Sequence, residues 1–254
     1  MQRLVCFIGL LLIFNMTEVL SQSSPVVNTA SQHTFEKQPV PYTAEYIFKK
    51  KGVSVAYITI ELKQDGRYWI YHTQAKPYGV GAWFTDITAQ EISRFYFDNN
   101  ELVPLSHRYE QTGKRRDDKS FAVIFADAAR TAQVRKADGE VEYALPDGIY
   151  DRQSVLAAMM LHLQQGNPQP AYAVFDEDEI KDYVVDLEGE ETLKTVLGQQ
   201  ITLKAGRTAK NKTTLTWFAK QLQFVPVKVE QYKKGNLDFV LEINALKFED
   251  PALN

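Results

Sequence analysis

Alternating apolar and polar residues run through the chain from residue 41 to its end. Between Tyr42 and Phe48, tyrosine, alanine and phenylalanine occupy every second position, and charged or hydroxyl side chains fill most of the positions between them. A period of two is typical of a β-strand with one buried face. The same reasoning predicts strands at 53–62, 67–74, 91–97, 104–111, 120–127, 132–135, 140–145, 171–175, 180–187, 191–196, 199–206, 213–218, 225–232 and 237–246. So many short strands in succession predict an antiparallel meander.

Short turn signals separate several of these strands. Asp65-Gly66 and Asp138-Gly139 each lie between two strand-like runs. Both positions tolerate the positive φ angles that a two-residue hairpin requires. Neighbouring strands are therefore expected to pair with each other.

The segment 151–165 has a different period. Its apolar residues recur at the i, i+3, i+4 and i+7 spacing of an amphipathic helix, and they are Leu156, Met159, Met160 and Leu163. Asp151 is placed to cap the start of this helix, and Gly166 is placed to end it. We expect the helix to pack on, or to plug, a curved sheet, with its stripe forming core and not a cofactor site.

Two hairpin-like segments on either side of this helix resemble each other. The separation between Pro104 and Gly113 equals the separation between Pro226 and Gly235. A proline that opens a strand and a glycine that closes it would explain the pattern, and chance similarity is the alternative. The predicted fold class is mainly β: an antiparallel meander forming a closed or half-open barrel from two similar halves.

The N-terminus has the pattern of an export signal. Arg3 precedes an apolar run at 4–14, which is shorter than the roughly 20 residues that a membrane helix needs. The expected cleavage site follows Ser21, with Ser23 as an alternative, and a retained anchor helix is the competing interpretation. The expected organisation is a signal peptide over 1–21, a flexible leader over 22–40 and a single β-barrel-like domain over 41–254.

Export has chemical consequences. Cleavage removes Cys6, the only cysteine, and leaves no transmembrane segment in the mature chain. We expect a periplasmic location. The formal net charge of -3 gives no electrostatic basis for binding nucleic acid.

Residues near the C-terminus resemble a known family. A family of exported bacterial proteins of unknown function has a W-F…L-P-V-K…G signature. This chain resembles that signature in Trp217-Phe218, Val225-Pro226-Val227-Lys228 and Gly235. Val225 stands where that family has leucine. The resemblance implies a periplasmic, β-rich domain with no assigned catalysis, and its plan is similar to half-barrel lipid carriers.

Catalytic and metal-binding patterns are weak in this sequence. It contains no Gly-x-Ser-x-Gly elbow, no His-x-x-x-His pair and no cysteine cluster, so no catalytic residue, metal site or cofactor is predicted. The acidic run at 176–179 is interpreted as a solvated turn. Asp and Glu are abundant, but nothing selects a pair for acid–base work.

Aromatic residues give the strongest hint of a ligand site. The stretch 77–84 is apolar, aromatic and glycine-rich, and it is interpreted as a lid over a cavity, with an aromatic plug as the alternative. Tyrosines in nearby strands would provide an apolar wall with hydroxyl groups. The candidate ligand-binding residues are Tyr57, Trp69, Tyr71, Tyr78, Trp83 and Phe84.

These observations favour a non-catalytic binding or carrier protein of the cell envelope over an enzyme. Its ligand would be lipid-like or a glycan. One alternative is a scaffold that binds another envelope protein through an open sheet edge. A second alternative is a carboxylate-dependent enzyme acting on glycan or peptidoglycan.

Overall fold

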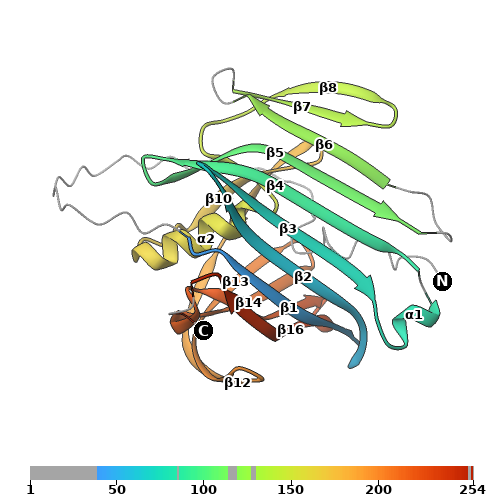
Figure 1. Cartoon of the computed structure of the whole chain (residues 1–254), viewed down its shortest axis with the longest axis vertical. Helices are drawn as coiled ribbons and strands as arrows, with labels where there is room; N and C mark the ends of the chain where they lie inside the picture. The colour runs from blue at the N-terminus through green and yellow to red at the C-terminus, as the bar shows by residue number, and fades with distance from the viewer. Residues whose placement is uncertain (1–38, 85, 114–118, 127–129, 251–252, 254) are drawn as a thin grey trace.

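The computed structural model describes residues 39–84, 86–113, 119–126, 130–250 and 253. The expected signal peptide at 1–21, and all of the expected leader at 22–40 except its last two residues, lie outside this range. Most of the described chain forms one strongly curved antiparallel sheet of 13 strands, seen in Figure 1.

The strands of the large sheet follow the chain closely. In chain order they are β1 (Tyr42–Lys50), β2 (Val53–Asp65), β3 (Tyr68–Pro77), β4 (Thr88–Asp98), β5 (Glu101–Thr112), β6 (Lys119–Ala126), β7 (Thr131–Lys136), β8 (Gly139–Ala144), β12 (Asp186–Thr195), β13 (Gly198–Ala209), β14 (Lys212–Ala219), β15 (Val225–Lys233) and β16 (Asn236–Phe248). In space the order runs from β12 through β16, then β1, and on to β8. The first strand thus pairs with the last.

The predicted antiparallel meander is confirmed, but the barrel is not closed. In the described residues β12 and β8 each pair on one side only, so the large sheet has two ends.

The alternation of apolar and polar side chains along each strand explains how one face of the sheet forms a core. In β1, Tyr42, Ala44, Tyr46 and Phe48 are buried, as the period of two requires.

A second, small sheet lies across from the large one. It contains β9 (Ile149–Asp151), β10 (Ala171–Asp176) and β11 (Glu179–Val184), and β9 pairs with β10 in parallel. The strand β9 is only three residues long and was not predicted. The segment 180–187 was predicted as one strand, whereas the structure divides it at Val185 between the two sheets.

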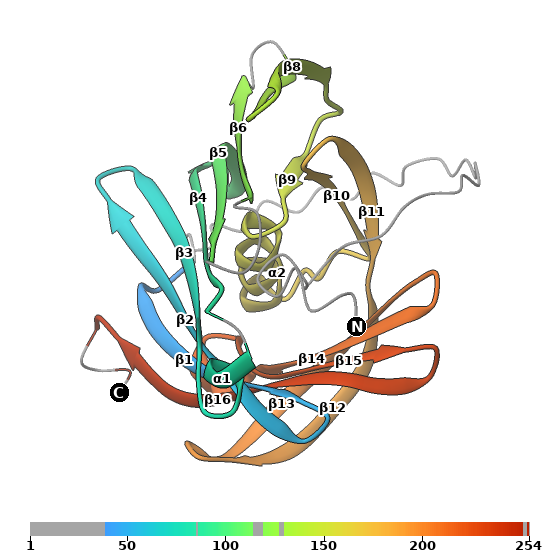
Figure 2. The ribbon, with the colours of Figure 1, turned by 90° about the vertical axis from the view of Figure 1, so that its right-hand side faces the viewer.

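The predicted helix is present as α2 (Ser154–Gln165). Figure 2 shows it inside the concave side of the large sheet, with β9–β11 on its other side. Most of its residues are buried, so it plugs the curve. Gly166 ends it with φ at +72°, and the amide of Asn167 donates to the carbonyl of His162, as in a Schellman-type end.

The paired prolines lie inside strands and do not open them. Pro104 pairs with Phe95 and Pro226 pairs with Phe218, and each pairing lies at a register shift. A bulge tolerates a residue that cannot donate to the ladder, so the two segments do share one local irregularity.

Two turn predictions are displaced by one residue. Register places Gly66 and Arg67 between β2 and β3, and residues 137 and 138 between β7 and β8. The described residues also contain the short helical turns α1 (Gly81–Phe84) and η3 (Lys220–Leu222). Within the described part of the chain, no helix is long and apolar enough to cross a membrane.

Candidate functional site

A cavity lies between the concave face of the large sheet, α2 and the end of β11. Strands β2–β4 form one wall and β13, β14 and β16 form another. The cavity has a volume of about 80 Å³. When the adjoining space that is open to solvent is counted as well, about 1010 Å³ is unoccupied. Aliphatic side chains that line it include Ile58, Ile60, Val155, Leu156, Met159 and Leu241.

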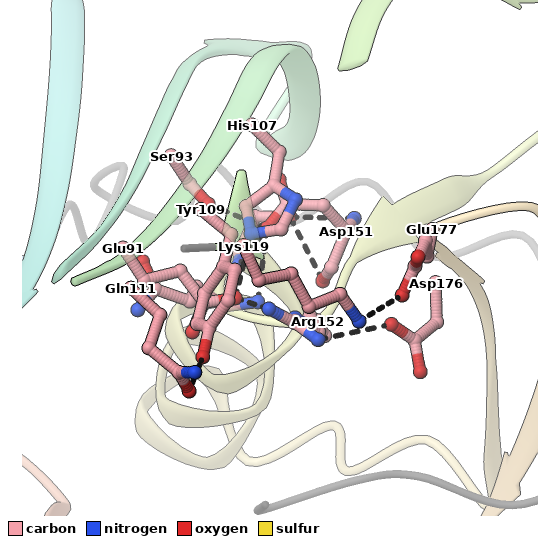
Figure 3. Close-up of polar contacts among 12 residues, drawn as sticks. Glu91, Ser93, His107, Tyr109, Gln111, Lys119, Asp151, Arg152, Asp176 and Glu177 are labelled. Atoms are coloured by element: carbon pink, nitrogen blue, oxygen red, sulfur yellow. Dashed lines mark hydrogen bonds and ion pairs between the residues drawn. The ribbon is translucent and has the colours of Figure 1, made fainter. Parts of the chain in front are cut away.

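A buried polar network forms one end of this cavity. Glu91 of β4 is 1% exposed and Arg152, just before α2, is 7% exposed. Arg152 Nε lies 2.5 Å from Glu91 Oε1, and His107 Nε2 of β5 lies 2.6 Å from the same oxygen. Arg152 Nη1 also lies 3.3 Å from Asp176 Oδ1. Figure 3 shows these groups converging from β4, β5, β10 and the start of α2.

The network favours the charged forms of Glu91 and Arg152. Burial acts to raise the pKa of Glu91, but the Arg152 guanidinium and His107 outweigh it and hold the pKa below its ordinary value. Burial likewise acts to lower the pKa of Arg152, and Glu91 and Asp176 reverse this shift. Lys181 Nζ, 2.6 Å from Asp176 Oδ2, adds a second buried cation. Buried charges are tolerated here because each is paired.

Asp151 connects the start of α2 to the large sheet. Its Oδ1 accepts hydrogen bonds from the amides of Gln153 at 2.9 Å and Ser154 at 3.0 Å, and from the hydroxyl of Ser93 at 2.5 Å. The Ser154 hydroxyl accepts from the amide of Asp151 in return. Asp151 therefore accepts amide hydrogen bonds at the entry to the helix, as predicted, but α2 begins at Ser154 and the residue at its N-cap position is Gln153.

Arg207 of β13 is the second arginine in the cavity wall. Its guanidinium carbon lies 3.7 Å from the centre of the Tyr183 ring, a cation–π arrangement. No carboxylate of the described residues lies within ion-pair distance of it, and its Nε is buried without a hydrogen-bond partner there. Burial lowers the pKa of Arg207, with Tyr183 and Asp176 opposing the shift.

The predicted ligand-binding residues do not form one cluster. Tyr71 lines the cavity, whereas Trp69 is buried with its ring 5.9 Å from that of Phe97. Tyr57 and Tyr78 contact each other, with ring centres 4.1 Å apart. Their role in binding stays a prediction.

Trp83 lies on α1 and is 80% exposed. The segment is attached to β2, because the amide of Tyr78 donates to the carbonyl of Val55. Phe84 closes α1, and its side chain lies outside the described structure. Of the six candidates, only Tyr71 is part of the cavity lining described above.

The polar residues of the site were missed by sequence analysis, although one signal was available. Glu91, Ser93 and Phe95 alternate on the same face of β4, and all three are buried. A charged residue on the inward face of a strand is unusual and indicates a buried partner. In the described residues, no group of three or more His, Asp or Glu side chains is arranged to hold a metal ion.

The groups around the cavity limit the chemistry that its described lining can offer. Ser93 is fully buried and donates to Asp151, so its hydroxyl is not accessible from the cavity. Glu91 is the only carboxylate in the described cavity lining, and it is engaged by Arg152 and His107. The arrangement provides an apolar space with a guanidinium at its wall.

Comparisons with known proteins agree with a β fold of unassigned function. The chain is similar to the crystal structure of a beta-barrel-like protein of domain of unknown function DUF1849 from Brucella abortus, with a TM-score of 0.55 and 8% identity, covering 84% of this chain and 100% of that one. At this identity the similarity concerns the fold alone. No curated protein matches the sequence significantly. The model of the family described as protein of unknown function DUF3108 matches residues 41–242, and the chain belongs to this family.

Proposed function

We propose that this protein is a non-catalytic binding or carrier protein of the cell envelope, and that its ligand carries an apolar chain. The observation that carries the proposal is the cavity between the curved sheet and α2. Ligand sites are typically concave and mostly apolar, with a few polar groups that fix orientation. This cavity has that composition.

The lining favours a lipid-like ligand over a glycan. Branched and unbranched aliphatic side chains such as Ile58, Leu156 and Met159 form much of its wall. A sugar would need many hydroxyl partners and a flat aromatic surface. Methionine, which adapts its shape easily, suits a flexible hydrocarbon chain better.

The enzyme alternative finds little support in the cavity. Retaining and inverting glycosidases both need two carboxyl groups facing the substrate, roughly 5 to 10 Å apart. Among the lining residues described, Glu91 alone carries a carboxylate, and Arg152 and His107 already engage it.

The scaffold alternative rests on the two ends of the open sheet. Strands β12 and β8 each present one unpaired edge among the described residues. Both edges carry exposed acidic residues, Glu188 and Glu190 on β12 and Glu140 and Glu142 on β8. Charges on an edge strand disfavour the addition of another strand, so we rank this function second.

The neutral fluorescent probe N-phenyl-1-naphthylamine tests the proposal. The purified mature protein should bind it and increase its fluorescence. Met159→Trp adds bulk to the cavity wall and should weaken binding, whereas Ile124→Trp, at an exposed position, should not. Absence of binding by the unmodified protein, or equal binding by both variants when folded, would contradict the proposal.

Location requires a separate experiment. The protein should be recovered from the envelope fraction of the host, with an N-terminus that begins after Ser21. Native mass spectrometry of this material should show a co-purifying lipid-like mass. An intact N-terminus in a cytosolic fraction would refute the envelope assignment.

A further inference from the structure

The charge balance of the cavity wall is uneven. Glu91 and Arg152 form an ion pair and cancel. Arg207 is left as a cation with no carboxylate within ion-pair distance among the described residues. Arg207 is half-buried, and desolvating a charge beside apolar side chains without a partner costs free energy.

Two of the residues that line the cavity each carry a buried, unsatisfied N–H group. Arg207 Nε and Arg152 Nη2 are both buried and have no hydrogen-bond partner in the described structure, and both residues line the cavity. Buried donors without partners are uncommon in folded proteins. Guanidinium donors match the oxygen geometry of carboxylates and phosphates.

The surroundings of Arg207 hold its guanidinium in place. The ring of Tyr183 lies 3.7 Å from its central carbon. Thr214, which is paired with Arg207 across β13 and β14, also lines the cavity and adds a hydroxyl group. The nearby Asp176 does not compete, because Lys181 and Arg152 occupy its oxygens.

We infer that Arg207 binds the acidic headgroup, a carboxylate or a phosphate monoester, of a single-chain amphiphile whose hydrocarbon chain occupies the cavity. This inference rests on the proposed function, since it names the class of ligand that the cavity takes. Cationic amphiphiles would be repelled by the guanidinium, and uncharged amphiphiles offer only neutral acceptors, which form weaker hydrogen bonds with it.

Three probes with the same 12-carbon chain test the inference: dodecanoate, dodecyl phosphate and the uncharged 1-dodecanoylglycerol. Their dissociation constants are measured below the critical micelle concentration by calorimetry and by displacement of N-phenyl-1-naphthylamine. At least one acidic probe should bind about tenfold more tightly than the neutral one, since a hydrogen bond to a charged group contributes about this much. The ratio between the two acids identifies the headgroup chemistry.

Arg207→Gln should remove this preference and leave the affinity for 1-dodecanoylglycerol within about twofold. Arg207→Lys keeps the charge and should keep part of the preference. Arg135→Gln is the matched control, because Arg135 is an exposed cation of β7 that pairs with Glu140. It should change none of the three affinities.

The outcomes separate the two proposals. Equal binding of acidic and neutral probes by the unmodified protein, or equal loss of all three in Arg207→Gln, would overturn the role of Arg207 and leave the carrier function standing. Failure of every probe, including N-phenyl-1-naphthylamine, would overturn both. Thermal unfolding of each variant confirms that it is folded.

Discussion

Arg152 Nε lies 2.5 Å from Glu91 Oε1, and the two residues join elements 61 positions apart in the chain. Arg152 precedes α2, whereas Glu91 belongs to β4 of the large sheet. Their ion pair is therefore a direct connection between the central helix and the wall around it. Together with the hydrogen bond from Ser93 to Asp151, it joins the start of α2 to β4.

Replacing Glu91 with glutamine should destabilise the protein by about 3 kcal/mol or more, because it leaves Arg152 buried with only part of its compensating charge. Urea unfolding followed by circular dichroism measures the change. Glu142→Gln is the control, since Glu142 is an exposed residue of β8 and its loss should cost less than about 0.5 kcal/mol. Similar midpoints for the two variants would contradict the structural role of the pair.

Replacing Asp151 with alanine should cost about 2 to 4 kcal/mol, because it removes the acceptor of the amides at the helix entry and leaves the buried Ser93 hydroxyl without its acceptor. Asp151→Asn retains an oxygen at the Oδ1 position and should cost less. Asp138→Ala, in the exposed turn between β7 and β8, serves as the control. Equal unfolding free energies for the alanine and asparagine variants would argue against this role of Asp151.

Most strands could be predicted because apolar and polar residues alternate along them, and the apolar residues are the buried ones, as in β1. It placed the helix because four apolar side chains share one face. The site could not be located in this way. Arg207 lies one residue beyond the strand predicted over 199–206, and its contact with Tyr183 joins residues of two different sheets.

The division of the predicted strand 180–187 has the same cause. No glycine or proline marks Val185, where the chain leaves the small sheet and joins the large one. Long-range packing decides this change of direction, and the local sequence carries no sign of it. By contrast, Glu91 on the inward face of β4 could have been recognised from alternation alone.

Replacing Gly81 with alanine should move α1 away from β2. A Cβ atom at Gly81 would overlap the carbonyl oxygen of Val55, so the backbone must shift, at a cost of about 1 to 3 kcal/mol. Hydrogen exchange of the Tyr78 amide, which donates to the same carbonyl, should become faster. Ala82→Ser, at an exposed neighbouring position, should leave it unchanged. Undisturbed protection of Tyr78 in the Gly81 variant would contradict this close packing.

The stability of the protein should decrease as the pH falls below about 6.5, and His162 should account for part of the decrease. Burial lowers the pKa of His162, and Glu101, whose Oε2 lies 3.6 Å from Nε2, opposes the shift only in part. Its Nδ1 lies 3.2 Å from the hydroxyl of Tyr172. In the unfolded chain the imidazole binds a proton near its ordinary pKa of about 6.5.

The sign of the effect follows from these two states. Between the unfolded and the folded pKa of His162, the unfolded chain binds the proton and the folded protein does not, so acid favours unfolding. His162→Gln should therefore show a smaller loss of unfolding free energy between pH 7 and pH 5 than the unmodified protein, whatever its stability at pH 7. His72→Gln provides a comparison, because burial also lowers the pKa of His72 but its side chain is only half-buried. Parallel pH profiles for the unmodified protein and His162→Gln would show that His162 does not contribute.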